Sequence, residues 1–365
     1  MKNLIKRYLR RALPCYKTAS IYQHSDVKIT NLYKATTFVM PELKDIFGHK
    51  HPLFGTHTCQ TSDAYIAEIN NGRCIIGNEE VFTSKNECLV EITSQKKNPK
   101  AGEIISKFIV KRVKGSVVNL SLSGLEDNYY HYNIEWLARL YLLKKSEIKP
   151  DYFIVPSNTT FQQEYLNILG IEKIKILKLK KGTLIEADNM IVPSLINNWE
   201  IKYCRDQKYH FKKWLPSWTR NIHKSLITLP TVSGVTKKIF LSRKFASCRK
   251  ITNESELINL ASKAGFKCYF MEELTVLEQI NLFKDASHII SIHGAGLVNM
   301  VHCTQKVRVL ELYSQHYHDP GMRMLAVLWV INMIILLEKL IIQRTFLLNK
   351  KMFTSIPRNL MKLYV

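Results

Sequence analysis

Apolar and polar positions follow two alternating periods through the second half of the chain. Short apolar runs typical of buried strands are separated by segments whose apolar residues recur every three to four positions, as on one face of a helix. Asn253 and Thr275 stand where helix N-caps are expected, and Gly265 stands where a helix should end. The four predicted strands are 238–243, 266–271, 288–292 and 307–312. Strands alternating with helices in this way predict a parallel α/β sheet.

The first half shows a similar alternation after a region rich in short strands. Residues 62–93 alternate β-rich runs with the turns NNG and GNEE, which predicts a meander of hairpins. A helix is predicted at 128–143 and another at 160–170, with strands at 151–157, 174–179 and 189–195. This half is therefore also expected to form a doubly wound sheet.

Residues 197–236 break both periods, and we place the domain boundary there. The predicted organisation has five parts: an N-terminal basic segment at 1–58, a first α/β domain at 59–200, a linker at 201–236, a second α/β domain at 237–340, and a C-terminal helical tail at 341–365.

Composition fits a folded protein, since 46% of the 365 residues are hydrophobic. The net charge of +23 suits a polyanionic partner: nucleic acid, an anionic membrane face, or a phosphate-bearing substrate. Lysines scattered over the surface would give the same total. The eight cysteines include no C-x-x-C pair, which favours a reduced, cytosolic protein.

No segment has the pattern of a signal peptide or a spanning helix. The most apolar stretch, 324–342, is interrupted by Asn332, Glu338 and Lys339, so we expect a core helix and strand there. Residues 2–13 fit either an interfacial basic helix or an ordinary solvated one.

Polar groups follow three of the predicted strands in the second half. Ser242 and Arg243 end the first strand, His293 follows the third, and Glu311 is expected at the end of the fourth. Because the carboxyl ends of parallel strands meet at one edge of a sheet, and ligands bind there, we expect these groups to lie close together.

Their chemistry suits a nucleoside diphosphate. Gly294 and Gly296 would let the backbone approach an anion at the positive end of the following helix. Arg243 and Arg249 could donate charge-assisted hydrogen bonds to phosphates, and Glu311 could accept from ribose hydroxyls. Each feature alone is weak, but together they predict a nucleotide-diphosphate site.

Other chemistries fit less well. The sequence HGAG resembles an esterase oxyanion turn, but no G-x-S-x-G supplies a nucleophile, and no Walker motif occurs. His316, His318 and Asp319 could ligate a metal, but the spacing places no further ligand, so a solvated polar loop is the favoured interpretation. No D-x-D motif is present, so the metal-chelating sequence of one large class of sugar transferases is missing.

These motifs together resemble glycosyltransferase family 61. The similarity runs over IFLSRKFASCRKITNESELINL, LEQI, HGAGLVN and VLELY, and it extends to the helix at 128–143 and the residues 161–194. The positions that carry the resemblance in the second half are Ser242, Arg243, Arg249, Asn253, Glu254, Glu278, Gln279, His293, Gly294, Ala295, Gly296, Leu297, Asn299 and Glu311.

The resemblance implies a GT-B architecture, in which two Rossmann-like domains, each with a parallel sheet, face a cleft. A nucleotide-sugar donor would bind the domain at 237–340, the domain at 59–200 would serve the acceptor, and the sugar would be transferred with inversion. The residues expected to bind the donor are Ser242, Arg243, Arg249, Asn253, Glu254, His293, Gly294, Ala295, Gly296, Asn299 and Glu311.

The expected role is that of a bacterial capsular-polysaccharide type of transferase that builds a surface polysaccharide on a glycan or lipid-linked acceptor. It would be cytoplasmic, with a possible peripheral contact to the inner face of the membrane. No metal or other cofactor is expected, because the nucleotide sugar is a co-substrate. Two alternatives stay open: a catalytically inactive scaffold, and a basic nucleic-acid-binding protein, although the sequence has no RRM, KH or zinc-finger motif.

The acceptor hydroxyl needs a base. His131 and Glu135 are four residues apart on the helix at 128–143 and should share one face. A neutral imidazole suits proton abstraction near pH 7, and Glu135 could orient it or replace it. The alternative is that His131 caps the helix and packs against Tyr129 or Tyr132.

Overall fold

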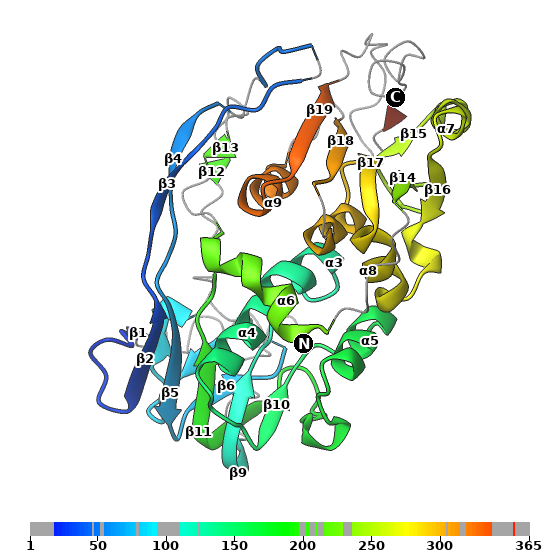
Figure 1. Cartoon of the computed structure of the whole chain (residues 1–365). Helices are drawn as coiled ribbons and strands as arrows, with labels where there is room; N and C mark the ends of the chain where they lie inside the picture. The colour runs from blue at the N-terminus through cyan, green and yellow to red at the C-terminus, as the bar shows by residue number, and fades with distance from the viewer. Residues whose placement is uncertain are drawn as a thin grey trace, which may run out of the picture. The chain divides into compact units, whose positions relative to one another are not determined.

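The chain forms two compact α/β units that are not the two halves of the sequence. In this computed structural model, unit 1 comprises Met1–Thr36 and Thr61–Trp199, and unit 2 comprises Thr37–Gln60 and Glu200–Val365 (Figure 1). The structure describes residues 18–45, 47–51, 55–77, 80–92, 110–122, 125–196, 202–203, 209–210, 215–228, 236–303, 306–313, 319–337 and 353–354.

Three sequence predictions fall largely outside these described residues. They concern the basic helix at 2–13, the loop histidines His316 and His318, and the C-terminal helical tail at 341–365. Within that tail only Phe353–Thr354 are described, as the short strand β20, which pairs with β15 (Lys250–Ile251).

Unit 1 is built on a nine-stranded mixed sheet, with its strands in the spatial order β1-β8-β7-β6-β11-β5-β2 and with β9 and β10 on the other side of β11. The strands are β1 (Thr18–Ala19), β2 (Val27–Tyr33), β5 (Ala64–Asn70), β6 (Arg73–Ile75), β7 (Val81–Phe82), β8 (Cys88–Leu89), β9 (Val110–Asn119), β10 (Tyr152–Ile154) and β11 (Leu184–Pro193). β9, β10 and β11 are parallel to one another, and β1 is parallel to β8, whereas β5 and β6 run antiparallel to β11. The expectation of a purely parallel sheet in this half was therefore wrong.

The NNG sequence is a kink within one long strand and not a hairpin turn, so the predicted meander is confirmed only for β6, β7 and β8, which pair antiparallel in chain order. The first half of β11 pairs with β6 and the second half with β5, so β5 and β6 follow each other along the same side of β11. Asn71 (φ 47°) donates its backbone N–H to Asp188 O, and Gly72 O accepts from Ala187 N. A Cβ on Gly72 would lie 2.5 Å from Met190 Cβ, so the kink has room only for glycine.

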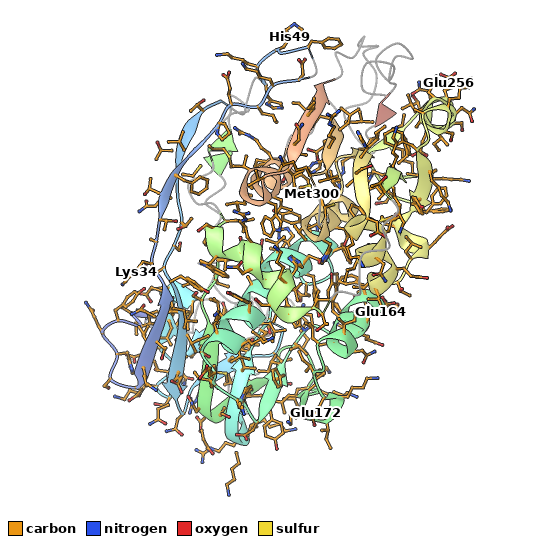
Figure 2. The ribbon with its side chains drawn as sticks, viewed as in Figure 1. Lys34, His49, Glu164, Glu172, Glu256 and Met300 are labelled. Atoms are coloured by element: carbon orange, nitrogen blue, oxygen red, sulfur yellow. The ribbon has the colours of Figure 1, made fainter. Side chains whose placement is uncertain are left out.

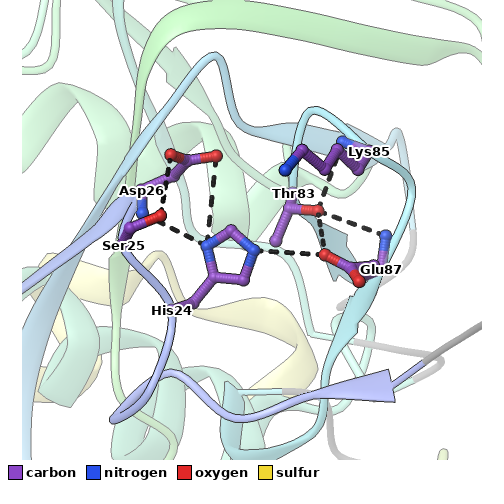
Figure 3. A network of polar contacts seen from close by, with 6 residues as sticks. All are labelled: His24, Ser25, Asp26, Thr83, Lys85 and Glu87. Atoms are coloured by element: carbon purple, nitrogen blue, oxygen red, sulfur yellow. Dashed lines mark hydrogen bonds and ion pairs between the residues drawn. The ribbon is translucent and has the colours of Figure 1, made fainter.

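The outer end of this sheet is fastened by side chains. His24 Nε2 lies 3.1 Å from Glu87 Oε2, and Thr83 Oγ1 donates to the same carboxylate at 3.3 Å (Figure 3). Because Asp26 N donates to His24 Nδ1 at 3.2 Å, the second ring nitrogen carries the proton in the neutral imidazole. This network ties the β1–β2 turn to the β7–β8 turn.

The predicted helix at 128–143 is confirmed, with a change of winding in its middle. It consists of α3 (Tyr129–His131), the π-helical η2 (Tyr132–Trp136) and α4 (Leu137–Lys145). The extra residue per turn brings the rings of Tyr132 and Trp136 into a stack, with centroids 4.4 Å apart, and both side chains are fully buried.

The rest of unit 1 agrees in part with the sequence. The helix predicted at 160–170 is present as α5 (Thr160–Ile168), and Gly170 follows it with φ 67°. The strand predicted at 174–179 was wrong: η3 (Lys173–Lys175) leads into a single bridge between Ile176 and Phe153. A further turn, η1, spans Val90–Ile92.

Unit 2 contains the predicted parallel sheet. Its five strands lie in the order β16-β14-β17-β18-β19, every described pairing between them is parallel, and Figure 1 shows them side by side. The strands are β14 (Lys237–Ser242), β16 (Lys267–Phe270), β17 (Ala286–Ile292), β18 (Arg308–Tyr313) and β19 (Asn332–Leu337). The connecting helices are α7 (Glu254–Lys263), α8 (Val276–Lys284), η6 (Ala295–His302) and α9 (Gly321–Trp329).

Most local predictions for unit 2 are confirmed. The apolar stretch 324–342 supplies α9 and β19, and Thr275 and Glu278 form the predicted capping box. Asn253 stands at the N-cap position of α7, but its side chain makes no capping hydrogen bond. The helix after HGAG is wound as a 3-10 helix.

Smaller elements complete unit 2. They are the ribbon β3 (Thr37–Met40) and β4 (His57–Gln60), the pair β12 (Lys202–Tyr203) and β13 (Tyr209–His210), and the helical turns η4 (Ser217–Asn221), α6 (Ile222–Leu226) and η5 (Met271–Glu273). Across the described parts of both units, no helix has the length and apolar character needed to span a bilayer.

Candidate functional site

The predicted donor-site residues of unit 2 converge at the carboxyl edge of its sheet. β14 and β17 are neighbours, with Leu241 paired to Ser291, so the segments that follow them start side by side. One segment begins with Arg243 and the other with His293 and Gly294. The alternation of strands and helices had predicted this convergence.

The Arg243 guanidinium lies against the Gly294 backbone. A Cβ placed on Gly294 would be 2.0 Å from Arg243 Nη1, so any larger residue there would displace the arginine. The φ of Gly294 is −175°, an extended value open to every residue, so the glycine is needed for space alone. Arg243 Nη2 also donates to Cys248 O at 3.2 Å.

Glu254, at the start of α7, holds the loop that follows β14. Its Oε1 accepts from Ser242 Oγ and from Arg243 N, both at 3.0 Å, and Ser242 Oγ accepts in turn from Lys244 N. Ser242 and Glu254 are therefore engaged with the loop itself, and they position Arg243. Asn253 lies next to this carboxylate, and its Nδ2 is 3.5 Å from Glu256 Oε2.

A second arginine lies in the same loop as Arg243. Arg249 has φ 54°, in the left-handed region, which turns the loop back toward β14. Burial, followed by the charge of Arg249, lowers the pKa of Arg243 from its usual value, and the same arginines lower the pKa of the Cys248 thiol against the opposing effect of burial. A cationic group whose pKa is lowered by a neighbouring cation favours an anion that can neutralise both charges. Cys248 was not singled out from the sequence, which carried no signal for it.

His293 and Glu311 form a buried pair. His293 Nδ1 lies 2.6 Å from Glu311 Oε1, the Glu311 side chain has no exposed area, and the Tyr313 ring centroid is 5.3 Å from that of His293. Contrary to expectation, Glu311 is not at a strand end: β18 continues to Tyr313, and Glu311 pairs with Ser291 and Ile335. The structure thus places Glu311 on the imidazole and inside the sheet.

Asn299 is an internal brace of the glycine turn. Its Nδ2 donates to Gln279 Oε1 at 2.8 Å and to Gly296 O at 3.1 Å, and its side chain is fully buried. Gln279 in turn donates to Met271 O and Leu274 O. A Cβ on Gly296 would lie 2.9 Å from Met271 Cγ, so this glycine also serves a close approach.

The hydrogen bond from Asn299 to Gln279 thereby attaches the glycine turn to α8. Ala295 and Gly296 are half-buried, whereas the following Met300, marked in Figure 2, is fully buried. The half-buried start of η6 is therefore the part of the turn that a ligand can reach.

The candidate general base and the carboxylate paired with it lie in unit 1. His131 Nδ1 is 2.7 Å from Glu135 Oε1, and their side chains are 21% and 10% exposed. Asn128, and not His131, caps the helix, because its Oδ1 accepts from Tyr130 N and His131 N. The His131 ring packs edge-on against Tyr130, with centroids 5.4 Å apart.

This pair sits at the junction of α3 with the π-helical turn η2. π-turns within helices are frequent at functional sites, which makes the position notable. With Glu135 ionised, Nδ1 carries the imidazole proton and Nε2 is left as the basic nitrogen.

Metal ligands do not cluster among the residues that the structure describes: no group of three or more His, Cys, Asp or Glu side chains is placed to hold a metal ion.

Comparison with known families gives a match that covers about half of the chain. The family model described as Glycosyltransferase 61 matches residues 129–310. The match supports a glycosyltransferase of family 61. The matched region opens at the helix that holds His131 and Glu135 and includes both arginines and the glycine turn.

No curated protein matches the sequence. Solved structures that overlap with it include the dodecameric iron-containing heptosyltransferase TibC in complex with ADP-D-beta-D-heptose (10% identity, TM-score 0.30) and the iron-containing dodecameric glycosyltransferase TibC from enterotoxigenic E. coli H10407 (11% identity, TM-score 0.27). Each alignment covers 85% of this chain and 82% of the other.

Proposed function

We propose that the protein is an inverting, metal-independent glycosyltransferase that moves a sugar from a nucleotide-sugar donor to a glycan or lipid-linked acceptor in the synthesis of a surface polysaccharide. The observation that carries the proposal is the Arg243 guanidinium against Gly294 at the carboxyl edge of a parallel sheet, within the region matched to the family. A GT-B arrangement of two Rossmann-like domains is part of the proposal.

The donor diphosphate would be held by unit 2. Arg243 and Arg249 would donate charge-assisted hydrogen bonds to its oxygens, and the first N–H groups of η6 would add to them. Glu254 and Asn299 would keep the loop and the turn in place through the contacts described above. Glu311 would fix the His293 ring beside the turn.

Transfer would begin at the acceptor hydroxyl. His131 Nε2 would take its proton while the oxygen attacks the anomeric carbon on the face opposite the leaving diphosphate, which inverts that centre. The bond from the anomeric carbon to the phosphate oxygen breaks, and the two arginines neutralise the departing charge. Glu135 would orient the imidazole and stabilise its cationic form.

A thermal-shift screen of nucleoside diphosphates and nucleotide sugars tests the proposed function. A ligand at 100 times its Kd adds about 2.7 kcal/mol to the free energy of unfolding, which raises Tm by at least about 5 °C for a unit of this size. One base should be preferred, and Arg243→Ala should reduce the shift at the same ligand concentration. If no nucleotide raises Tm more than inorganic phosphate does, the donor site is wrongly assigned.

Transfer should proceed without a divalent metal. The cationic side chains Arg243 and Arg249 would take the part that a metal plays in enzymes with D-x-D. Sugar transfer measured in excess EDTA is therefore expected to match transfer in added magnesium or manganese within about twofold. Activity lost in EDTA and restored by manganese would contradict this.

A further inference from the structure

Unit 1 carries a dense strip of lysines that the proposed transfer does not use. The segment 173–181 contains five lysines and no acidic residue in nine positions. Four of these side chains are exposed, and Lys175 is partly exposed. We call this segment, together with the exposed Lys111, Arg112 and Lys114 of β9, the lysine strip.

Backbone contacts fix the strip on the edge of the sheet. At one end Leu177 N donates to Phe153 O in β10; at the other, Gly182 N donates to Ile76 O, and Leu184 begins its pairing with Val110 in β9. The segment therefore runs back along the length of β9. Figure 2 labels Glu172, the residue that precedes the segment.

Side chains that pack on the core alternate with exposed side chains along residues 177–180. Leu177 and Leu179 pack on the core of unit 1, while Lys178 and Lys180 between and after them are exposed. The lysines are thus displayed by an anchored chain.

Nearby acids neutralise only a small part of the charge. Glu172 pairs with Lys175 at 2.8 Å, and Glu186 is shared between Arg73 and Arg112. Asp151 accepts from Ser116 N and Oγ. Within the described part of the chain, no ion pair is formed by the remaining lysines of the strip, which are Lys111, Lys114, Lys173, Lys178, Lys180 and Lys181.

An apolar side chain stands among these charges. Ile174, between Lys173 and Lys175, is 85% exposed, the largest exposed fraction among the large apolar residues described. An isoleucine at that exposure contributes little to the fold. Its position suits insertion between lipid headgroups, because water is excluded from it there.

We propose that the lysine strip docks unit 1 on an anionic lipid bilayer. Each lysine near such a surface contributes roughly 1 kcal/mol, which is about fivefold in affinity. Ile174 distinguishes a bilayer from nucleic acid, since a phosphate backbone offers nothing apolar to bury it. The contact does not depend on transfer activity, and it gives a location to the membrane contact that net charge alone suggested.

Cosedimentation of the full chain with vesicles tests the proposal. Binding is expected to phosphatidylcholine vesicles containing 30% phosphatidylglycerol, and not to phosphatidylcholine alone, and it should weaken strongly between 0.1 and 0.5 M salt. Lys173→Glu/Lys178→Glu/Lys180→Glu should lower the partition coefficient about 100-fold. Ile174→Ser should lower it about tenfold and leave Tm unchanged, because the side chain is exposed.

A matched charge reversal supplies the control. Lys224, Lys263 and Lys306 are exposed lysines of unit 2, and changing all three to Glu alters net charge equally. This control should keep at least a third of the vesicle binding. Equal loss in both triple variants would reduce the effect to net charge and overturn the proposal. Binding of a DNA duplex that depends on the strip, without vesicle binding, would assign it to nucleic acid instead.

Discussion

The His131→Ala variant is expected to transfer sugar at least about 100-fold more slowly than the parent protein, with its affinity for the donor nucleotide unchanged. Loss of a positioned general base lowers a rate by about this factor. His131 lies 2.7 Å from Glu135, and Asn128 caps the helix in its place, so its removal costs no cap. Single-turnover transfer and calorimetry of the nucleoside diphosphate would separate the two quantities.

One further variant distinguishes the roles of His131 and Glu135, and another serves as a control. Glu135→Gln keeps an oxygen that can accept from Nδ1 but removes the charge, so its rate should fall less than that of His131→Ala. If His131→Ala keeps near-normal turnover while Glu135→Gln does not, Glu135 is the base. Asp45 and His49 form a histidine–carboxylate pair of the same spacing, with His49 75% exposed. His49→Ala should leave transfer unchanged.

Arg243→Ala is expected to weaken nucleoside diphosphate binding by about 1.5–3 kcal/mol, or about 10- to 150-fold in Kd, because one charge-assisted hydrogen bond is lost. Gly294→Ala should weaken it to a similar extent while Arg243 is still present. The new Cβ would lie 2.0 Å from Nη1, and the flexible arginine would be displaced.

Calorimetry of both variants gives the measurement. Arg308→Ala, which removes an exposed arginine from the start of β18, is the control and should bind normally. An Arg243→Ala variant with unchanged affinity would remove Arg243 from the donor site. Normal affinity in Gly294→Ala alone would show that the close approach is not required.

Much of unit 2 was predictable from the sequence because its central strands β14, β17 and β18 are largely buried on both faces. Such strands are continuous apolar runs, and the capping box at Thr275 and the glycine at 265 mark helix ends within a few residues. The meeting of Arg243 with Gly294 follows from the parallel order of the strands. These features could be predicted from short stretches of sequence, because hydrophobic periodicity is a local pattern.

What was missed depends on which segments are neighbours. Asn71 and Gly72 look the same in sequence whether they form a hairpin turn or a kink, and only the arrival of β11 alongside both strands decides between them. Glu311 was expected to reach a ligand, but the register of β18 on β17 places it where His293 covers its carboxylate. No local sequence pattern indicates either the kink or the position of Glu311.

The order in which the chain is synthesised bears on the ribbon β3–β4. Residues 37–60 belong to unit 2, yet they leave the ribosome before most of unit 1 and long before β14. Met40 and Cys59 are fully buried in the finished protein, and Asp45 bridges Ile335 of β19, nearly 300 residues away. During translation, the apolar side chains of the ribbon therefore remain exposed while the part of unit 1 that follows it in the sequence is synthesised. A single genetic cut near residue 200 would give a C-terminal fragment without its ribbon and an N-terminal fragment with an unpaired one, so the two units cannot be expressed separately by dividing the gene at that point.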